Sequence, residues 1–481
     1  MLDLTAAEIA QVVGGRLLAG APELRVAGVS TDSRTLQPGQ LFIPLKGERL
    51  DGHRFVEEAL EEGAAGALVE EDGPKRAELL NTLLPRQELW RQAFLVGVPG
   101  TSWEAFHRLA AYHRARFPIP VVAVTGSNGK TTTKELVAQV LACRWRTLRS
   151  PGNFNNDVGL PLTLLDLGPE FQALVVEMGM RGRGEIERLC RMARPTAGIV
   201  TNVGPVHLER LGSLEAIAAA KSELVEALPE DGIAVLNQDD PRVRVMASHT
   251  KARVVTYGLD EGDVSARDVV LGADGARFHL VWRGGHGEAA VPVHLPLLGR
   301  HNVMNALAAS ACALALGFEP EEVARALARV QAPKLRLERV EIGGRFIIND
   351  AYNASPASMA AALEVLDLVA QGRKGAVLGD MLELGAVAHA EHVRLGRRAA
   401  EAGLAYLVVV GERAAEISEG AREAGMSPEA IHLASGWEEA VRLVESLSQP
   451  GDTILVKASR GLGLERVVQG LARKEAGGHE L

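Results

Sequence analysis

Residues 125–132 read Thr125-Gly126-Ser127-Asn128-Gly129-Lys130-Thr131-Thr132, and this stretch decides the fold of the middle of the chain. The β-branched apolar run 119–125 ends at the first residue of this stretch and is typical of a buried strand. A helical pattern begins near Lys130. Glycines let such a loop curl until several backbone N–H groups point into one concavity, where a helix N-terminus and a lysine attract negative charge. The stretch therefore predicts a phosphate-binding loop between a strand and a helix.

The loop departs from the usual phosphate-loop pattern at one position. That pattern has a glycine five residues before its Gly-Lys pair, and Val124 stands there. Taken alone, the stretch also fits a glycine-rich turn with an incidental lysine. The preceding strand and the run Gly-Lys-Thr-Thr favour nucleotide binding, because Thr131 offers a hydroxyl where nucleotide-bound Mg²⁺ needs a ligand.

Strands and helices alternate on both sides of the loop. Buried-strand runs occupy 173–176, 197–201 and 233–236, and helical patterns such as 215–228 lie between them. This alternation predicts a parallel sheet covered on both faces. A second series follows Pro333, with strands expected at 346–348, 376–378, 407–410 and 453–456.

Two regions differ from this pattern. Residues 260–297 alternate apolar and polar side chains between glycines, which predicts an antiparallel insert. The first 98 residues have short strands and frequent Gly and Pro. We therefore expect an α/β protein of three domains, with boundaries at 1–98, 99–332 and 333–481, a division that also suits a chain of 481 residues.

Composition excludes several classes of protein. Apolar residues make up 47 % and charged residues 23 %, as in ordinary globular chains, and 52 basic against 61 acidic residues gives a net charge of −9, which disfavours general nucleic-acid binding. Cys143, Cys190 and Cys312 lie far apart and show no zinc-ligand or disulfide pattern. No apolar run approaches the ~20 residues of a membrane span, and no signal sequence is evident, so we expect a cytoplasmic protein.

Two further expected strands end in polar residues. Glu177 follows one strand, and His207 lies in the segment after another. Ligands of doubly wound sheets bind beyond the carboxyl ends of the strands, so these side chains are candidates for metal or phosphate contacts. Each alone also fits a solvated carboxylate or an ordinary loop histidine. Lys221, in an alanine-rich helical stretch, has the local pattern of a surface lysine.

Together these motifs resemble those of the Mur ligases, ATP-dependent amide-forming enzymes of peptidoglycan precursor synthesis. The phosphate loop is similar to theirs, which also lacks the earlier glycine. The supporting segments are Gly299-Arg300-His301-Asn302-Val303-Met304-Asn305-Ala306, Arg336-Leu337-Glu338, Asn153 to Pro161, Asp350 to Met359, Leu378 to Gly385 and Lys457 to Arg460. The N-terminal segments Asp32-Ser33-Arg34, Pro38 to Phe42 and Gly52 to Phe55 fit the same family.

The resemblance implies a fold and an activity. It implies a small N-terminal domain for a UDP-linked substrate, a central ATP-binding domain and a Rossmann-like C-terminal domain that closes on ATP. The segments fit best the branch that adds D-alanyl-D-alanine to UDP-N-acetylmuramoyl-tripeptide through an acyl phosphate, with ATP and two Mg²⁺ ions. A monomer would suffice. The D-N-P-R signature of the diaminopimelate-adding branch does not occur.

The resemblance also implies roles for individual residues. The expected nucleotide contacts are Gly126, Ser127, Asn128, Gly129, Lys130, Thr131, Thr132, Asn237, Asn302, Arg336 and Asp350. The expected metal ligands are Thr131, Glu177, His207 and a carbamylated Lys221, and the catalytic group comprises Lys130, Glu177, His207 and Lys221. The residues expected to face the UDP-sugar are Ser33, Arg34, Lys46, Asp51 and His53. Those expected to face the tripeptide are Asn155 and Asn156. Each of these loop residues also fits a simple turn former.

Two alternatives remain at this point. The first is a sibling ligase of the same fold that adds a single amino acid, or a folylpolyglutamate synthetase. The second is a non-catalytic nucleotide switch whose phosphate loop controls partner binding. The switch leaves the N-terminal region and the segment 350–359 unexplained.

Overall fold

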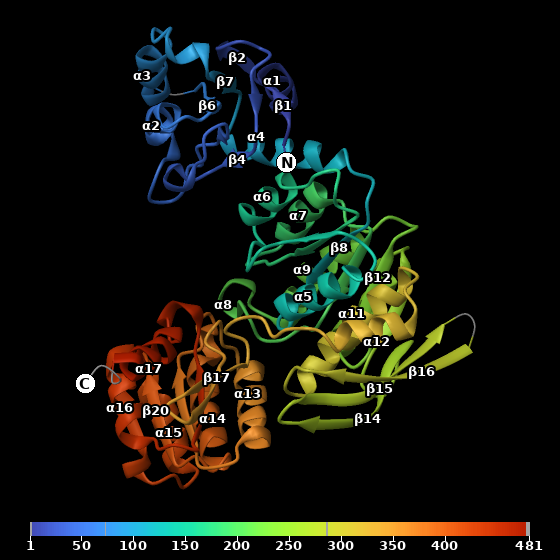
Figure 1. Cartoon of the computed structure of the whole chain (residues 1–481), viewed down its shortest axis with the longest axis vertical. Coiled ribbons are helices and arrows are strands. Elements are labelled where there is room, and N and C mark those ends of the chain that lie inside the picture. Colours follow the sequence, from blue (N-terminus) through green and yellow to red (C-terminus); the bar gives the residue numbers. More distant parts are fainter. Residues whose placement is uncertain (1, 73, 285–286, 478–481) are drawn as a thin grey trace. The chain divides into compact units, whose positions relative to one another are not determined.

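The computed structural model describes residues 2–72, 74–284 and 287–477. Figure 1 shows the chain coloured along its sequence, with strands and helices alternating over most of its length. The predicted α/β class is confirmed. None of the helices in these residues combines the length and the apolar character that a membrane crossing requires.

The N-terminal region holds two small sheets, with strand orders β1-β3 and β2-β7-β6-β5-β4. Strands β4 to β7 pair in parallel, and β2 runs antiparallel to β7. The strands are β1 (Leu4–Thr5), β2 (Arg16–Ala19), β3 (Arg25–Val26), β4 (Val29–Ser30), β5 (Leu41–Phe42), β6 (Gly66–Glu70) and β7 (Phe94–Val98), and the helices are α1 (Ala6–Val13), α2 (Val56–Glu61) and α3 (Pro74–Leu83). Phe42, Val56, Val69 and Leu95 belong to the buried core between sheet and helices.

A nine-stranded sheet follows, with the order β16-β15-β14-β13-β12-β11-β8-β10-β9. Its strands are β8 (Val121–Thr125), β9 (Thr147–Arg149), β10 (Ala173–Glu177), β11 (Ala197–Val200), β12 (Ile233–Asn237), β13 (Arg253–Tyr257), β14 (Val264–Gly272), β15 (Gly275–Gly284) and β16 (Gly287–Leu295). Its helices are α4 (Ser102–Ala115), α5 (Lys130–Leu141), α6 (Gly159–Leu165), α7 (Glu185–Ala193), α8 (Leu208–Leu211), α9 (Leu214–Glu226), α10 (Pro241–Arg244), α11 (Arg300–Ala315) and α12 (Pro320–Leu327). Strands β14 to β16 pair antiparallel, which confirms the predicted insert.

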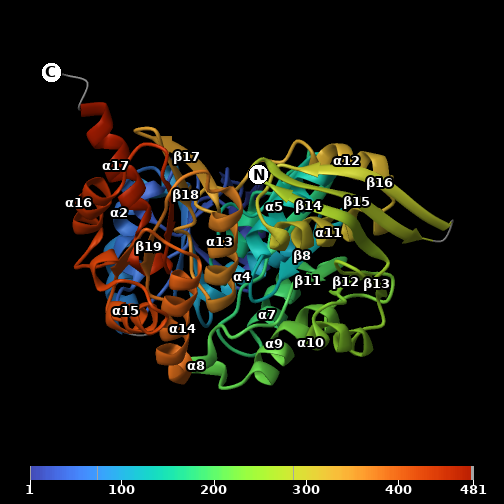
Figure 2. The ribbon, with the colours of Figure 1, turned by 90° about the horizontal axis from the view of Figure 1, so that it is seen from below.

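The C-terminal region contains a six-stranded sheet of order β17-β18-β22-β19-β20-β21, parallel except for the first pair. Its elements are β17 (Glu338–Ile342), β18 (Arg345–Asn349), β19 (Lys374–Gly379), β20 (Tyr406–Val410), β21 (Ile431–Ala434), β22 (Thr453–Lys457), α13 (Pro356–Val369), α14 (Ala388–Glu401), α15 (Ala414–Glu423), α16 (Trp437–Leu447) and α17 (Glu465–Gly477). One core joins the sheet to α13, α14 and α15, and another joins it to α16 and α17, so helices cover both faces (Figure 2).

Packing divides the chain into two compact units. The first comprises Met1–Ala123, Arg144–Gly179 and Glu185–Ala197, and the second comprises Val124–Cys143, Met180–Gly184 and Gly198–Leu481. The phosphate loop and the whole C-terminal region therefore belong to the second unit, whereas Glu177 and the N-terminal region belong to the first. The predicted boundaries at residues 98 and 332 stay a prediction.

Helix α4 shows how the local sequence produces one element of the first unit. The side chain of Thr101 caps its N-terminus by accepting a hydrogen bond from the Glu104 N–H at 3.2 Å. Ala105, Phe106, Leu109, Ala110 and His113 are buried along one face, at helical spacing. The helix ends three residues before Pro118, because the residue before a proline disfavours helical geometry.

Candidate nucleotide and substrate sites

The phosphate loop has the tight geometry that its glycines predict. Gly126 and Gly129 have φ angles of +148° and +83°, values that favour glycine. A Cβ on Gly126 would lie 1.8 Å from Thr201 Oγ1, and one on Gly129 would lie 2.5 Å from Asn305 Oδ1. At these two positions the backbone therefore lies directly against neighbouring polar side chains, with no space for a Cβ atom.

Two residues that the sequence prediction missed hold this loop in place. Thr201 Oγ1 and Asn202 Nδ2 donate hydrogen bonds to the carbonyl of Asn128 at 2.6 Å and 3.1 Å, and the Asn128 N–H donates to Asn202 Oδ1 at 2.9 Å. Both residues follow β11 directly. Their place at a strand end was the signal that could have identified them, since it was already used for His207.

Lys130 lies over the loop to which it belongs. Its ammonium group donates to the carbonyls of Gly126 and Ser127 at 2.8 Å and 3.3 Å. Ser127 in turn exchanges two hydrogen bonds with the backbone of Gly204, at 3.1 Å and 2.8 Å. The positive charge is thus placed at the concavity of the loop, where a phosphate group would bind.

Arg336 reaches the phosphate loop from the linker before β17. Its guanidinium donates to Thr131 Oγ1 at 2.8 Å and lies over the ring of Tyr352, 4.1 Å from the centroid. Leu335 and Leu337 on either side have φ angles of +62° and +51°, which are strained for leucine. The strained linker and the aromatic ring together direct the guanidinium at the loop, and the contact of Arg336 with a nucleotide stays a prediction.

Asp350 supports this linker. Its carboxylate accepts a hydrogen bond from the Leu337 N–H at 3.2 Å and forms an ion pair with Lys457 at 2.6 Å. Lys457 also donates to the carbonyl of Asn353 at 2.9 Å and is almost fully buried. Asp350 therefore fixes the residue next to Arg336, and its own contact with a nucleotide stays a prediction.

His207 and Lys221 also lie in the second unit. His207 has a φ angle of +55°, and its Nδ1 contacts the carboxylate of Glu383, which itself has a positive φ. Burial lowers the pKa of His207, and the charges of Lys130 and Lys221 act in the same direction while Glu383 opposes them. Lys221, on α9, is buried; burial and the charge of Lys130 bring its pKa well below the usual range. It is not the surface lysine that its local sequence suggests.

Asn237 and Asn302 are buried and hydrogen-bonded within the second unit. Asn237 Nδ2 donates to the carbonyl of Thr201 at 2.7 Å, and Asn302 Nδ2 donates to that of Leu298 at 2.9 Å. Asn305, which the prediction did not include, donates to Asn302 Oδ1 at 3.0 Å. These amides stabilise the surroundings of the phosphate loop, and their proximity to adenine stays a prediction.

In the first unit, Glu177 ends β10 with its side chain buried. Its carboxylate accepts a hydrogen bond from Asn155 Nδ2 at 2.7 Å, and its N–H donates to Ser150 Oγ at 3.0 Å. Asn156 Oδ1 accepts from the N–H groups of Val158 and Gly159 at 3.1 Å and 2.9 Å. The structure therefore brings Asn155 to Glu177, and it gives Asn156 the turn-forming role common for asparagine.

The N-terminal region contains a small hairpin, residues 45–52, which we call the substrate hairpin because it includes Lys46 and Asp51, two of the residues predicted to face the UDP-sugar. Lys46 pairs with Asp51 across it, and the Gly47 N–H donates to the carbonyl of Leu50 at 2.8 Å. Lys46 is exposed, and so is Arg34, whose guanidinium forms an ion pair with Asp32 at 2.6 Å. Ser33 is buried. The predicted UDP-sugar residues thus differ in exposure.

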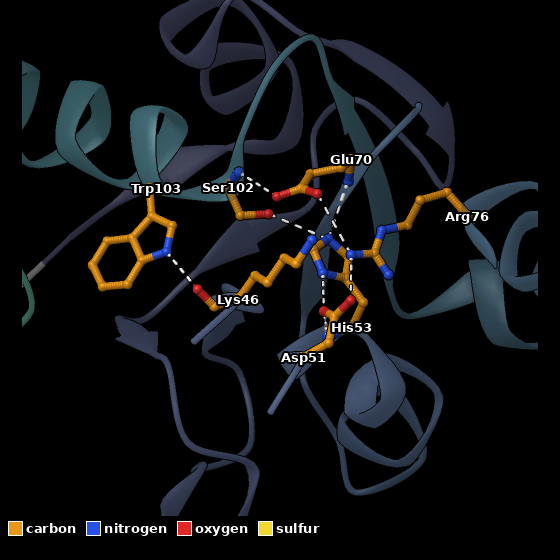
Figure 3. Close-up of polar contacts among 7 residues, drawn as sticks. All are labelled: Lys46, Asp51, His53, Glu70, Arg76, Ser102 and Trp103. Carbon is orange, nitrogen blue, oxygen red and sulfur yellow. Dashed lines mark hydrogen bonds and ion pairs between the residues drawn. The ribbon is translucent and has the colours of Figure 1, made fainter. Parts of the chain in front are cut away.

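A buried polar network holds the base of the substrate hairpin (Figure 3). His53 Nδ1 donates to Asp51 Oδ1 at 2.9 Å, while Nε2 accepts from the Glu70 N–H at 3.2 Å and lies 3.3 Å from Ser102 Oγ. Arg76 binds the other oxygen of Asp51 at 2.7 Å, and the Ser102 N–H donates to Glu70 Oε1 at 2.9 Å. His53 is 1 % exposed, and burial lowers its pKa, so the neutral ring is favoured.

Comparisons with known proteins decide the family. Models described as "Mur ligase family, catalytic domain", "Mur ligase middle domain" and "Mur ligase, glutamate ligase domain" match residues 25–88, 124–313 and 335–460. The chain is also 38 % identical to the UDP-N-acetylmuramoyl-tripeptide–D-alanyl-D-alanine ligase of Bacillus subtilis, over 98 % of this chain and 99 % of that protein. The chain belongs to the Mur ligase family.

Other Mur ligases agree with this assignment. The enzyme of the same name from Escherichia coli is 36 % identical, over 98 % of this chain and 99 % of that one. A crystal structure of MurF from Acinetobacter baumannii has a TM-score of 0.86 at 32 % identity and covers 98 % of this chain and 99 % of its own. MurF from Thermotoga maritima, in complex with ADP, has a TM-score of 0.78 at 28 % identity, over 93 % of this chain and 98 % of its own.

Mg²⁺ prefers oxygen ligands in proteins. In this Mur ligase chain, Thr131 of the second unit offers a hydroxyl oxygen and Glu177 of the first unit offers a carboxylate, so each is a donor of a type that suits Mg²⁺. Across residues 2–72, 74–284 and 287–477, no group of three or more His, Cys, Asp and Glu side chains forms a ready metal site. A magnesium site in this chain would therefore also need oxygen donors of other kinds, such as the Thr131 hydroxyl and the phosphate oxygens of a bound nucleotide.

Proposed function

We propose that this chain joins D-alanyl-D-alanine to UDP-N-acetylmuramoyl-tripeptide at the expense of ATP. The observation that carries the proposal is 38 % and 36 % identity, over nearly the full length, to two enzymes with that name. A diaminopimelate ligase and a folylpolyglutamate synthase share the fold at only 21 % and 18 % identity. A single-amino-acid ligase and a non-catalytic switch are therefore not favoured.

The reaction has two steps. A carboxylate oxygen at the C-terminus of the tripeptide attacks the γ-phosphorus of ATP, so an acyl phosphate forms and ADP leaves. The amino nitrogen of D-alanyl-D-alanine then attacks the acyl carbon, a proton leaves the nitrogen, and phosphate departs as the amide forms. Phosphoryl transfer between anions depends mainly on positioning and on charge neutralisation.

The residues of the second unit suit the first step. Lys130 would exchange the carbonyls of Gly126 and Ser127 for the β- and γ-phosphates, and the loop N–H groups would bind the same oxygens. Arg336 is already hydrogen-bonded to Thr131 and would add a second cation from the C-terminal domain. We propose that domain 1–98 binds the UDP-sugar, domain 99–332 binds ATP and domain 333–481 binds the dipeptide. Closure of the C-terminal domain on ATP would complete the site.

Two Mg²⁺ ions would neutralise charge on the transferring phosphoryl group. Thr131 and Glu177 would hold one, and His207 and Lys221 the other. A charged lysine cannot bind a cation, but a carbamate can. Burial favours the neutral amine of Lys221, which is the form that adds to CO₂ with loss of a proton. The residues proposed to contact the UDP-sugar are Ser33, Arg34, Lys46, Asp51 and His53. Those proposed to contact the tripeptide are Asn155 and Asn156. We further propose that the chain works as a monomer in the cytoplasm.

Phosphate release tests the proposal. The purified chain is given Mg-ATP and UDP-N-acetylmuramoyl-tripeptide, with and without D-alanyl-D-alanine, and the product is weighed by mass spectrometry. Release that needs both substrates and yields the pentapeptide product supports the proposal. A preference for a single amino acid, or ATP binding without turnover with any acceptor, would refute it.

A further inference from the structure

Helix α4 connects two loops that the proposed function assigns to opposite ends of one substrate. Trp103 Nε1 donates to the carbonyl of Lys46, in the substrate hairpin, at 2.9 Å (Figure 3). His107 Nε2 donates to the carbonyl of Asp157 at 2.9 Å. Asp157 ends the segment 153–157, which we call the peptide loop and which contains Asn155 and Asn156. All of these residues belong to the first unit.

The two donors lie on one face of the helix. Residues four apart are neighbours on a helix surface, about 6 Å apart along its axis. The rings of Trp103 and His107 meet edge to face with centroids 5.9 Å apart, so each ring limits the rotation of the other. Both side chains are half-buried. The helix thus presents two donors at a fixed separation, one to each loop.

Each loop is also anchored at its other side. Ser102, next to Trp103, joins the network around His53 and Asp51 at the base of the substrate hairpin. In the peptide loop, Arg188 of α7 binds both carboxylate oxygens of Asp157, at 2.9 Å and 2.8 Å. Both loops are therefore rigid enough for a change in their separation to affect a ligand that binds to both.

We propose that Trp103 and His107 are positioning residues that set the distance between the nucleotide-sugar end and the peptide end of the bound substrate. Neither residue needs to touch the substrate, because each acts through the backbone carbonyl of a loop. This inference rests on the proposed function, which supplies the substrate that spans the loops. It predicts selection for the length of the UDP-sugar-peptide rather than for either end alone.

Conservative variants separate this role from a structural one. W103F and H107F keep an aromatic ring but remove the hydrogen-bond donor, and Y112F is the matched control at an exposed position of the same helix. A single hydrogen bond corresponds to about a fivefold effect. We expect W103F and H107F each to raise KM for UDP-N-acetylmuramoyl-tripeptide about fivefold, with KM for ATP and for the dipeptide unchanged and Y112F like the wild type.

A second measurement tests the spacing directly. Binding of UDP alone, by calorimetry, should change less than twofold in either variant, because UDP occupies only one end. Unchanged KM in both variants would overturn the inference, and so would equal weakening of UDP and of the full substrate. Thermal unfolding shows whether each variant is folded. If W103F does not fold, the KM and the UDP affinity of H107F alone test the inference. Wild-type turnover with D-alanyl-D-alanine tests the proposed function separately.

Discussion

Protonation of His113 should destabilise the chain in mild acid. The ring lies on α4, is 1 % exposed and packs edge to face on Phe117, with centroids 5.1 Å apart. Its Nε2 donates to the carbonyl of Leu167 at 3.0 Å, whereas Nδ1 has no hydrogen-bond partner among the described residues. A proton on Nδ1 would therefore create a buried charge and an unsatisfied donor, and burial lowers the pKa of His113 to about 4.

The magnitude follows from linkage between protonation and folding. The ordinary value of 6.5 applies to the unfolded chain, so between pH 6.5 and about 4 the unfolded state binds the proton and the folded state does not. The contribution of His113 to the free energy of unfolding is fully present above pH 6.5 and decreases as the pH falls toward 4. At pH 4.5 the loss is about 2.5 kcal/mol.

Urea unfolding of the wild type and of H113Q, followed by circular dichroism between about pH 4.5 and 8, measures this effect. Glutamine can still donate to the carbonyl of Leu167 but does not titrate. We expect the wild type to lose about 2.5 kcal/mol more than H113Q over this range. Parallel pH dependence in the two proteins would refute the reasoning. Other buried histidines, such as His53, titrate equally in both, so the comparison removes their contribution.

Three further predictions concern the second unit. G126A places a Cβ 1.8 Å from Thr201 Oγ1 at a φ of +148°, so the affinity for ADP, measured by calorimetry, should fall at least tenfold; unchanged affinity would contradict the loop assignment. R336K keeps the charge but loses the planar group that lies on Tyr352, so KM for ATP should rise about tenfold while KM for the dipeptide stays constant. After equilibration with ¹³C-bicarbonate, the wild type should show a carbamate carbon resonance that K221M lacks; identical spectra would exclude carbamylation of Lys221.

Local sequence was sufficient to predict the phosphate loop and the eight strands for which it gave bounds, which correspond to β8, β10, β11, β12, β18, β19, β20 and β22. Glycine, lysine and a β-branched run within a few residues determine a strand, a loop and a helix, and the expected strands 173–176 and 407–410 differ from β10 and β20 by one residue. Strand β17 was not expected. Its sequence Glu-Arg-Val-Glu-Ile lacks a continuous apolar run, because one face of this edge strand is solvated.

Contacts between distant residues were not predictable in the same way. Arg336 and Thr131 are 205 residues apart, and Ser355, which donates to Asn128 Oδ1 at 2.8 Å, is 227 residues from it. No local pattern encodes such pairs, since they depend on how separately folded elements pack. His53 shows the same limit, because its sequence motif does not reveal that both ring nitrogens are engaged inside the chain.

The pairing of Trp103 with His107 has a consequence for how this helix can evolve. Each residue of an α-helix adds about 100° of rotation and 1.5 Å of rise. Inserting or deleting one residue between positions 103 and 107 would therefore turn one ring about a quarter of the way around the helix. Substitutions elsewhere on the exposed surface of α4 leave this geometry intact. Across related proteins we therefore expect exposed positions of α4 to vary in side chain, while Trp103, His107 and the number of residues between them stay constant.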